Sequence, residues 1–118
     1  FNNSSLGMVK LEMLVEGLPD HETDHEKVDF AAIAKGAGIE SVRITDPKKL
    51  KKELAAALKK KGPVLIDVVT DPLALSMPPK ITAHQIRGFA MSSTKVVLGG
   101  GVGKMVDMAR SNVRNIPR

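Results

Sequence analysis

The sequence predicts an α/β fold: part of a doubly wound parallel sheet with flanking helices, followed by a helical C-terminal tail. An alternating run at 41–45 suits a short strand, a helical pattern begins at Asp46, and a β-branched apolar run at 63–69 suits a second strand. Strand, helix and strand in this order form a βαβ unit with parallel strands. A near-continuous apolar run is typical of a parallel strand that is covered on both faces.

A helix and an acidic loop are expected before this unit. The segment 6–16 places Leu6, Val9 and Met13 on one helical face, so these residues are expected to face inward. Residues 19–27 are polar and acidic, which indicates a loop.

Two further helices begin at recognisable caps. Asp29 can cap a helix at about 30–37, and Asp46 can cap the helix of the βαβ unit, which has Pro in its first position, reaches about residue 61 and stops at Gly62. The residues expected to face inward are Phe30, Ile33, Ala34 and Ala37 in the first helix, and Leu50, Leu54, Ala57 and Leu58 in the second.

The C-terminal third predicts two helices joined by a hinge. Thr82 can cap a helix at 83–98, the glycine-rich segment 99–103 forms the hinge, and a short helix follows at 104–112. The apolar side of the longer helix is expected to comprise Ile86, Phe89, Ala90 and Val97.

Charge separates the C-terminal third from the rest of the chain. The whole chain has a net charge of +5, whereas residues 80–118 carry seven basic residues against Asp107 alone. Such a segment suits an anionic partner, either phosphate or a lipid surface, and a solvated surface explains it equally well. In this C-terminal third, Lys104, Arg110, Arg114 and Arg118 supply positive charge around the last short helix.

Composition excludes several classes of function. The 118 residues, 42% of them hydrophobic, suit one globular core, and the absence of cysteine excludes disulfides and thiolate metal sites. No apolar run is long enough to cross a bilayer, and no signal peptide is evident. Because the chain begins with Phe1 rather than Met, we expect it to be part of something longer. The lysine-rich helix has no interleaved aromatic residues, so no nucleic-acid partner is expected.

Two motif matches are better explained by loops. His21 to His25 reads as the zinc-protease pattern HExxH, but it lies in the acidic loop and has no evident third ligand. The segment 99–104 is similar to a phosphate-binding loop, but both glycine spacings fail and no strand directly precedes it.

The N-terminal residues, Phe-Asn-Asn-Ser-Ser-Leu-Gly, are more informative. A hydrophobic residue, two Asn and a turn into a helix suit the carboxyl end of a strand in a parallel sheet, where ligands bind. An Asn carboxamide oxygen and a backbone carbonyl are hard ligands that suit Mg²⁺, and the helix N-terminus can hold a phosphate. The Asn-Asn pair alone is better explained by an ordinary turn.

The rest of the chain adds a resemblance. The N-terminal stretch resembles the end of the thiamine diphosphate motif, which begins with Gly-Asp-Gly and closes with Asn-Asn. Over essentially its whole length the chain resembles thiamine-dependent decarboxylases and oxidases, and in particular the quinone-reducing pyruvate oxidases (pyruvate dehydrogenase (quinone)). The resemblance implies that residues 1–79 are the C-terminal half of the pyrophosphate-binding domain and that residues 80–118 are a helical tail. The stretches that carry the resemblance are 29–34, 38–39, 42–44, 62–69, 78–81, 87–90 and 105–112.

The resemblance implies roles for individual residues. Asn3 would bind Mg²⁺ through its side chain and Ser5 through its backbone carbonyl, and Leu6 and Gly7 would lie with them against the cofactor. Met8, Val9 and Glu12 would face the reacting groups, with Val9 supplying apolar packing and Glu12 a carboxylate for proton handling or electron transfer to flavin. Alternatively, Glu12 is an ordinary solvated helix residue.

The resemblance also implies an activity for the complete enzyme. Pyruvate would be oxidatively decarboxylated to acetate and CO₂ with thiamine diphosphate, Mg²⁺ and FAD, and the electrons would pass to membrane quinone. The enzyme would be a cytoplasmic homo-oligomer, a tetramer, on the inner face of the cell membrane. Its tail would bind anionic phospholipid through Lys104, Met105, Val106, Met108, Ala109 and Arg110.

Alternatives remain open. A related thiamine enzyme such as acetolactate synthase would carry the same cofactor domain, and a non-catalytic membrane-binding module would use only the tail. The Gly-Asp-Gly half of the motif, the activating Glu and the flavin domain are absent from these 118 residues, so we expect the chain alone to be inactive.

Overall fold

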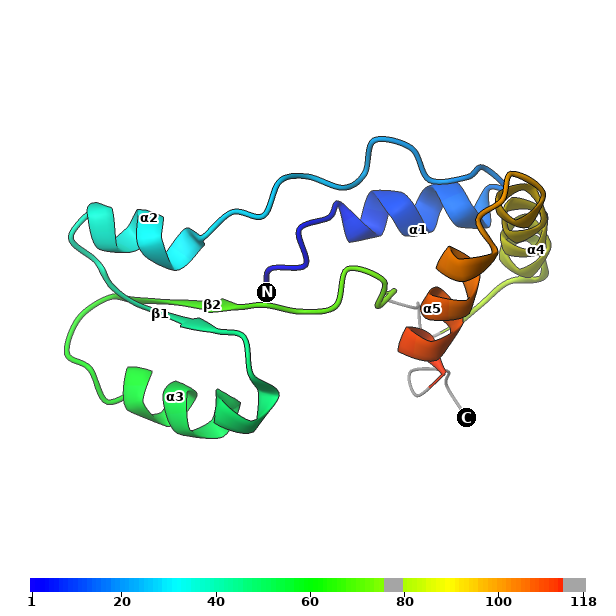
Figure 1. Cartoon of the computed structure of the whole chain (residues 1–118). Helices are drawn as coiled ribbons and strands as arrows, with labels where there is room; N and C mark the ends of the chain where they lie inside the picture. The colour runs from blue at the N-terminus through cyan, green and yellow to red at the C-terminus, as the bar shows by residue number, and fades with distance from the viewer. Residues whose placement is uncertain (76–79, 114–118) are drawn as a thin grey trace. The chain divides into compact units, whose positions relative to one another are not determined.

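The computed structural model describes residues 1–75 and 80–113. The chain forms two compact units that interleave in sequence. Unit 1 contains Phe1–Ser4 and Glu26–Thr70, and unit 2 contains Ser5–His25 and Asp71–Arg118. Figure 1 shows the elements of each unit. The predicted domain boundary at residue 79 lies outside the described residues.

Unit 1 is built around two parallel strands. β1 (Glu40–Ile44) pairs with β2 (Val64–Val68), with Glu40 opposite Val64 and Ile44 opposite Val68. The connection runs through the 3₁₀ turn η1 (Pro47–Lys49) and the helix α3 (Leu50–Ala57). α2 (Phe30–Gly36) and α3 both pack against the strands, on opposite sides of them in Figure 1. The predicted α/β class and βαβ unit are confirmed.

The N-terminal residues extend this sheet beyond β2. Asn2 forms a parallel bridge with Val69. The Asn2 N–H donates to the Val68 carbonyl (2.8 Å), and the Thr70 N–H donates to the Asn2 carbonyl (3.0 Å). The start of the chain therefore lies beside the carboxyl end of β2, as predicted for a strand end over a parallel sheet.

The predicted caps of unit 1 are confirmed, whereas several predicted buried faces are wrong. Asp29 accepts a hydrogen bond from the Ala32 N–H and Asp46 accepts one from the Lys48 N–H. α3 is shorter than predicted. Ala34 and Ala57 are buried as predicted, and Ala31 is buried as well. The other predicted inward residues are exposed, namely Phe30, Ile33, Ala37, Leu50, Leu54 and Leu58. Small side chains allow the helix backbones to lie close to the sheet.

The described part of unit 2 contains three helices and an apolar core of its own. They are α1 (Gly7–Val15), α4 (Ala83–Leu98) and α5 (Val102–Asn112). Leu11, Leu14, Leu75 and Met108 form the core, and Val15, Phe89 and Met105 pack against it. The predicted Thr82 cap of α4 is confirmed and forms a capping box with Gln85.

α4 crosses the C-terminal end of α1 at very short range. A Cβ atom at Gly88 would lie 1.7 Å from the Val15 carbonyl oxygen, so only glycine fits at this contact. One helical turn further along, Ser92 Oγ donates to the Leu14 carbonyl (2.8 Å), and Lys95 Nζ donates to the Gly17 carbonyl (2.8 Å). α4 thus satisfies carbonyl groups that a helix C-terminus leaves unpaired.

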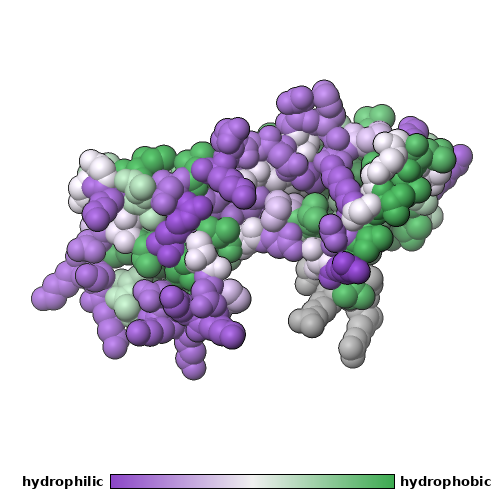
Figure 2. All heavy atoms as spheres, in the orientation of Figure 1, coloured by the Kyte–Doolittle hydropathy of each residue, from purple (hydrophilic) through white to green (hydrophobic). Residues whose placement is uncertain are grey.

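This crossing decides which helix faces are buried, and it makes two predicted faces wrong. α1 buries Lys10, Leu11 and Leu14, whereas the predicted inward residues Leu6 and Val9 are exposed. α4 buries Gly88 and Ser92, whereas Ile86, Ala90 and Val97 are exposed. Hydrophobic atoms accordingly gather on the surface over α4 in Figure 2. Among the described residues, no helix is long and apolar enough to span a bilayer.

Candidate functional site

In unit 1 the first Asn of the motif is locked into the sheet. Asn2 is 5% exposed, and its Nδ2 donates to the Val28 carbonyl (2.9 Å) and to Asp67 Oδ2 (3.4 Å). Its Oδ1 accepts from the Ser4 N–H at 3.4 Å. The Asn2 carboxamide is therefore engaged within unit 1 and has a structural role there.

The chain turns sharply just after this Asn pair. Ser4 has a φ of +50°, a left-handed conformation that is uncommon outside glycine. Asn3, directly before it, is half-buried. Strained backbone of this kind concentrates at ligand-binding positions, because the surrounding structure must hold it in place.

An ion pair between a half-buried arginine and a buried aspartate joins the two strands of unit 1. Arg43 on β1 lies directly opposite Asp67 on β2, and Arg43 Nη1 binds Asp67 Oδ2 at 3.1 Å. The same guanidinium lies 3.4 Å from Asp29 Oδ1. The pKa of Asp29 is lowered, mainly because its carboxylate accepts a backbone hydrogen bond from Ala32 and also because Arg43 is close.

In unit 2 the chain after the turn is fixed to the acidic loop. Ser5 is buried and bridges Asp24 in antiparallel fashion. Ser5 Oγ (3.2 Å) and the Leu6 N–H (2.7 Å) both donate to the Thr23 carbonyl. The Ser5 backbone, whose carbonyl is the other predicted Mg²⁺ ligand, is therefore fixed by hydrogen bonds from Ser5 and Leu6 to the Thr23 carbonyl.

The N-terminus of α1 has the character of an anion site. Its N-cap residue is Leu6, which offers no side-chain cap, and no acidic residue lies in the first turn. Gly7 begins the helix. Uncapped N–H groups and the positive end of the helix dipole suit a phosphate group. The Asn3 carboxamide of unit 1 and the Ser5 carbonyl of unit 2 are each hard oxygen donors, a ligand type that suits Mg²⁺.

The three predicted catalytic residues share the open side of α1. Met8 and Val9 are 58% and 46% exposed, and Glu12 is exposed as well. The opposite side of the helix is held by the core. Within unit 2 these three side chains are exposed and could contact a ligand.

A buried lysine is the main feature that the sequence did not predict. Lys10 is 1% exposed, and its Nζ lies 2.7 Å from Asp24 Oδ1 and 3.9 Å from Asp20 Oδ2. The pKa of Asp24 is lowered because Lys10 and Ser5 donate hydrogen bonds to it and because Lys10 and Lys104 attract its charge. Nothing in the helical pattern marks Lys10, since a lysine usually lies on the solvated face.

The predicted membrane-binding residues of α5 divide into two groups. Lys104 Nζ pairs with Asp20 (2.7 Å), Met108 is in the core and Met105 packs against it. Asn112 adds two contacts, accepting from the Leu75 N–H and donating to the Leu73 carbonyl. Val106, Ala109 and Arg110 are exposed. Arg114 and Arg118 lie outside the described residues, as do Pro78 and Pro79.

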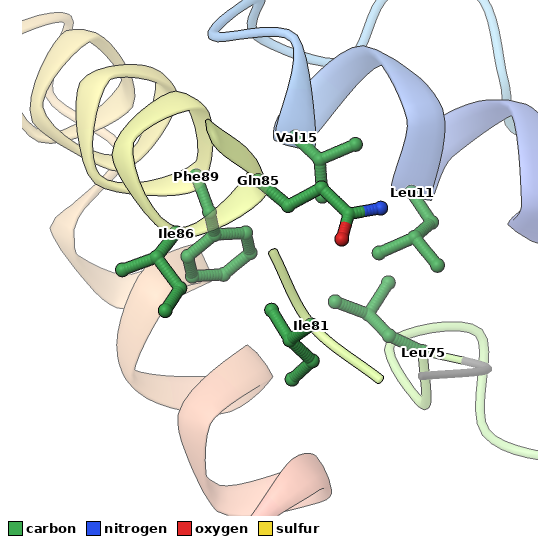
Figure 3. A pocket seen from close by; sticks show the side chains of 7 residues that line it. All are labelled: Leu11, Val15, Leu75, Ile81, Gln85, Ile86 and Phe89. Carbon is green, nitrogen blue, oxygen red and sulfur yellow. The ribbon is translucent and has the colours of Figure 1, made fainter. Parts of the chain in front are cut away.

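Unit 2 also contains an apolar pocket of about 160 Å³ between α1, α4 and the segments next to them (Figure 3). The residues that line it are Leu11, Val15, Leu75, Ile81, Gln85, Ile86 and Phe89. The one polar side chain, Gln85, is engaged in the capping box through its Oε1. A cavity of this size holds about one benzene-sized ring, but it offers no acid–base group.

The HExxH match lies in a loop in the structure. His21 and His25 are exposed in the loop. No group of three or more His, Cys, Asp or Glu side chains within residues 1–75 and 80–113 could hold a metal ion. The interpretation of this segment as a loop is confirmed.

Comparison with known proteins agrees with this geometry. Residues 1–68 match the family model described as "Thiamine pyrophosphate enzyme, C-terminal TPP binding domain". The chain is 35% identical over 91 residues to "Putative thiamine pyrophosphate-containing protein YdaP" of Bacillus subtilis (strain 168), covering 75% of this chain and 15% of that protein. It is 37% identical over 82 residues to "Probable acetolactate synthase large subunit" of Methanocaldococcus jannaschii, covering 67% of this chain and 14% of that protein. The chain therefore spans about a seventh of the length of these curated relatives.

Proposed function

The chain belongs to the family of C-terminal TPP-binding domains of thiamine pyrophosphate enzymes, and we propose that it holds the cofactor's diphosphate through Mg²⁺. The observation that carries this proposal is the turn at Asn2–Ser4 beside the carboxyl end of β2. Ligands in open parallel sheets bind at this end of the strands. Asn3 would supply its carboxamide oxygen to the metal, and Ser5 its backbone carbonyl.

The first turn of α1 would hold the phosphate groups. Gly7 at the start of the helix permits close approach of the backbone, and the uncapped N–H groups can donate to phosphate oxygens. When bound, the cofactor supplies the nucleophilic carbon that decarboxylation of a 2-oxo acid requires. Met8 and Val9 would exclude water from that carbon, and the Glu12 carboxylate would hold or accept a proton beside it.

We further propose that the complete enzyme is a pyruvate oxidase that uses FAD and membrane quinone. The whole-chain resemblance and the basic C-terminal segment support it. The alternative, an acetolactate synthase that joins two keto acids, is supported by the name of one relative. Both proposals need the same metal-binding turn, so the turn does not separate them.

Product analysis separates the two activities. The complete enzyme is incubated with pyruvate, thiamine diphosphate, Mg²⁺, FAD and a soluble quinone. Formation of acetate and CO₂ with an equal amount of reduced quinone would support the oxidase. Acetolactate with no quinone reduction would overturn it in favour of the synthase.

Membrane binding through α5 is a separate proposal. Val106, Ala109 and Arg110 form an exposed side with apolar and basic character, which suits an anionic interface. We expect the complete enzyme to co-sediment with vesicles that contain phosphatidylglycerol, and Arg110→Gln to weaken this binding. Arg87→Gln on α4 is the matched control, since Arg87 is also exposed. Equal binding of wild type and Arg110→Gln would remove α5 from this role.

A further inference from the structure

We propose that Arg43 and Asp67 are positioning residues that fix the Asn2 carboxamide and thereby the turn that presents Asn3 to the metal. The inference rests on the proposed function, because it assigns a task to residues behind the metal ligand. Both residues lie on strands of unit 1, and neither belongs to the Asn-Asn motif.

Two donors and two acceptors form a closed arrangement behind the turn. Arg43 Nη1 donates to the Val28 carbonyl (3.0 Å) and to Asp67 Oδ2 (3.1 Å). Asn2 Nδ2 donates to the same two oxygens, at 2.9 Å and 3.4 Å. Both acceptors are thus shared between the guanidinium and the carboxamide.

This arrangement sets which way the Asn2 carboxamide points. Its amide nitrogen must face the two acceptors, because its oxygen would be repelled there. The Oδ1 atom is therefore directed to the Ser4 N–H, where it accepts a hydrogen bond at 3.4 Å. That contact spans Asn3 and supports the left-handed conformation of Ser4. The side-chain orientation of Asn2 and the backbone path through Asn3 are linked in this way.

The burial of Asp67 makes a purely structural role a poor explanation. Asp67 is 3% exposed, and its Oδ1 has no hydrogen-bond partner among the described residues. A buried carboxylate is costly even when it is paired, and an apolar residue of similar size often stabilises a fold as well or better. Its neighbours on β2, Ile66 and Val68, are apolar. The orientation of the Asn2 carboxamide thus explains why a carboxylate is present at position 67.

Metal binding tests this directly in the complete enzyme. Mn²⁺ stands in for Mg²⁺, and electron paramagnetic resonance measures free Mn²⁺ in a titration with and without thiamine diphosphate. We expect Asp67→Asn and Arg43→Met to raise the Mn²⁺ dissociation constant about tenfold, as is typical when a residue supporting a metal ligand is lost. The matched control is Glu40→Gln on β1, which breaks only the exposed Glu40–Lys60 pair.

Each outcome bears on one claim. If the wild type shows no Mn²⁺ binding that depends on thiamine diphosphate, the proposed function itself fails. If the wild type binds and Asp67→Asn binds equally tightly, the positioning role is overturned. Thermal unfolding separates stability from positioning, since a merely structural pair would lower the melting temperature of the metal-free enzyme without changing the dissociation constant. If Asp67→Asn does not fold, Arg43→Lys provides the test. We expect Arg43→Lys to raise the Mn²⁺ dissociation constant less than Arg43→Met does. An unchanged dissociation constant in both Arg43 variants would overturn the proposal.

Discussion

Lys10 is a fully buried charged side chain, and its charge is balanced by the acidic loop. Asp24 binds it at 2.7 Å and Asp20 lies 3.9 Å away. Asp20 also pairs with Lys104 of α5. Removing one partner of a buried charge is costly because the other is left uncompensated. The loop that follows α1 is thus held to the helix by charge as well as by backbone hydrogen bonds.

We expect Asp24→Asn to destabilise unit 2 at neutral pH, by about 1 kcal/mol because Asp24 itself is largely exposed. The Asp24 pKa is lowered from its ordinary value of 3.8, so its contribution is fully present above that pH. It is lost as the pH falls below 3.8 through the lowered pKa. Hydrogen exchange of the α1 amides measures this, with Glu22→Gln as the control. If the stability difference between wild type and Asp24→Asn stays constant until Asp24 is fully protonated, the Asp24 carboxylate is not the source of this stability.

Residues that act locally could be predicted from the sequence. Asp29, Asp46 and Thr82 were recognisable as caps, because a cap depends on the three or four residues that follow it. Lys10 and Asp67 could not be recognised in this way. Their burial depends on partners far away in the chain, and no local pattern identifies those partners.

α4 contacts the C-terminal end of α1 through a close glycine approach and through two side-chain hydrogen bonds, in addition to apolar packing by Phe89. Gly88 permits close contact with the Val15 carbonyl, and Ser92 and Lys95 donate to carbonyl groups at and beyond the end of α1. The helix that is proposed to carry the phosphate site and Glu12 is therefore anchored at its C-terminal end. Its N-terminal end and its open side remain accessible in unit 2.

We predict that Gly88→Ala destabilises this helix pair by about 3 kcal/mol, because the new Cβ would overlap a backbone oxygen that cannot move aside cheaply. Gly103→Ala on α5 is the matched control. No atom lies within 4 Å of a Cβ there, so this change should be neutral or stabilising. The measurement is the melting temperature of each variant. Equal melting temperatures for the two variants would show that the helix crossing is looser than described.

Helix positions could be predicted from the sequence, whereas their buried faces could not. The apolar stripe of α1 was expected at Leu6, Val9 and Met13, although Leu6 and Val9 prove to be exposed. Apolar periodicity shows which helix face is hydrophobic, but that face can lie against a ligand or another part of the protein instead of the core. On α1 several apolar residues lie on the open side, which is the side assigned to the cofactor and substrate. The failure of the prediction thus coincides with the proposed site.

For the molecule as a whole, the βαβ pattern predicted the fold class, and the combined resemblance of stretches along the chain, rather than the Asn-Asn pair alone, predicted the cofactor family. The family match over residues 1–68 agrees with both. The sequence could not show that Asn2 would be committed to the sheet, because that depends on Val28, Asp67 and Val69. The structure thereby gives Asn2 a task in the sheet, whereas the metal-binding task of the adjacent Asn3 is our proposal.

The affinity of the complete enzyme for thiamine diphosphate in the presence of Mg²⁺ tests the central claim most directly. Isothermal titration calorimetry compares the wild type with Asn3→Ala and with Asn3→Asp, which keeps an oxygen ligand. We predict that Asn3→Ala weakens cofactor binding by at least about tenfold, or about 1.4 kcal/mol, and that Asn3→Asp retains most of the affinity. Unchanged affinity in Asn3→Ala would contradict the assignment of this turn as the metal and diphosphate site.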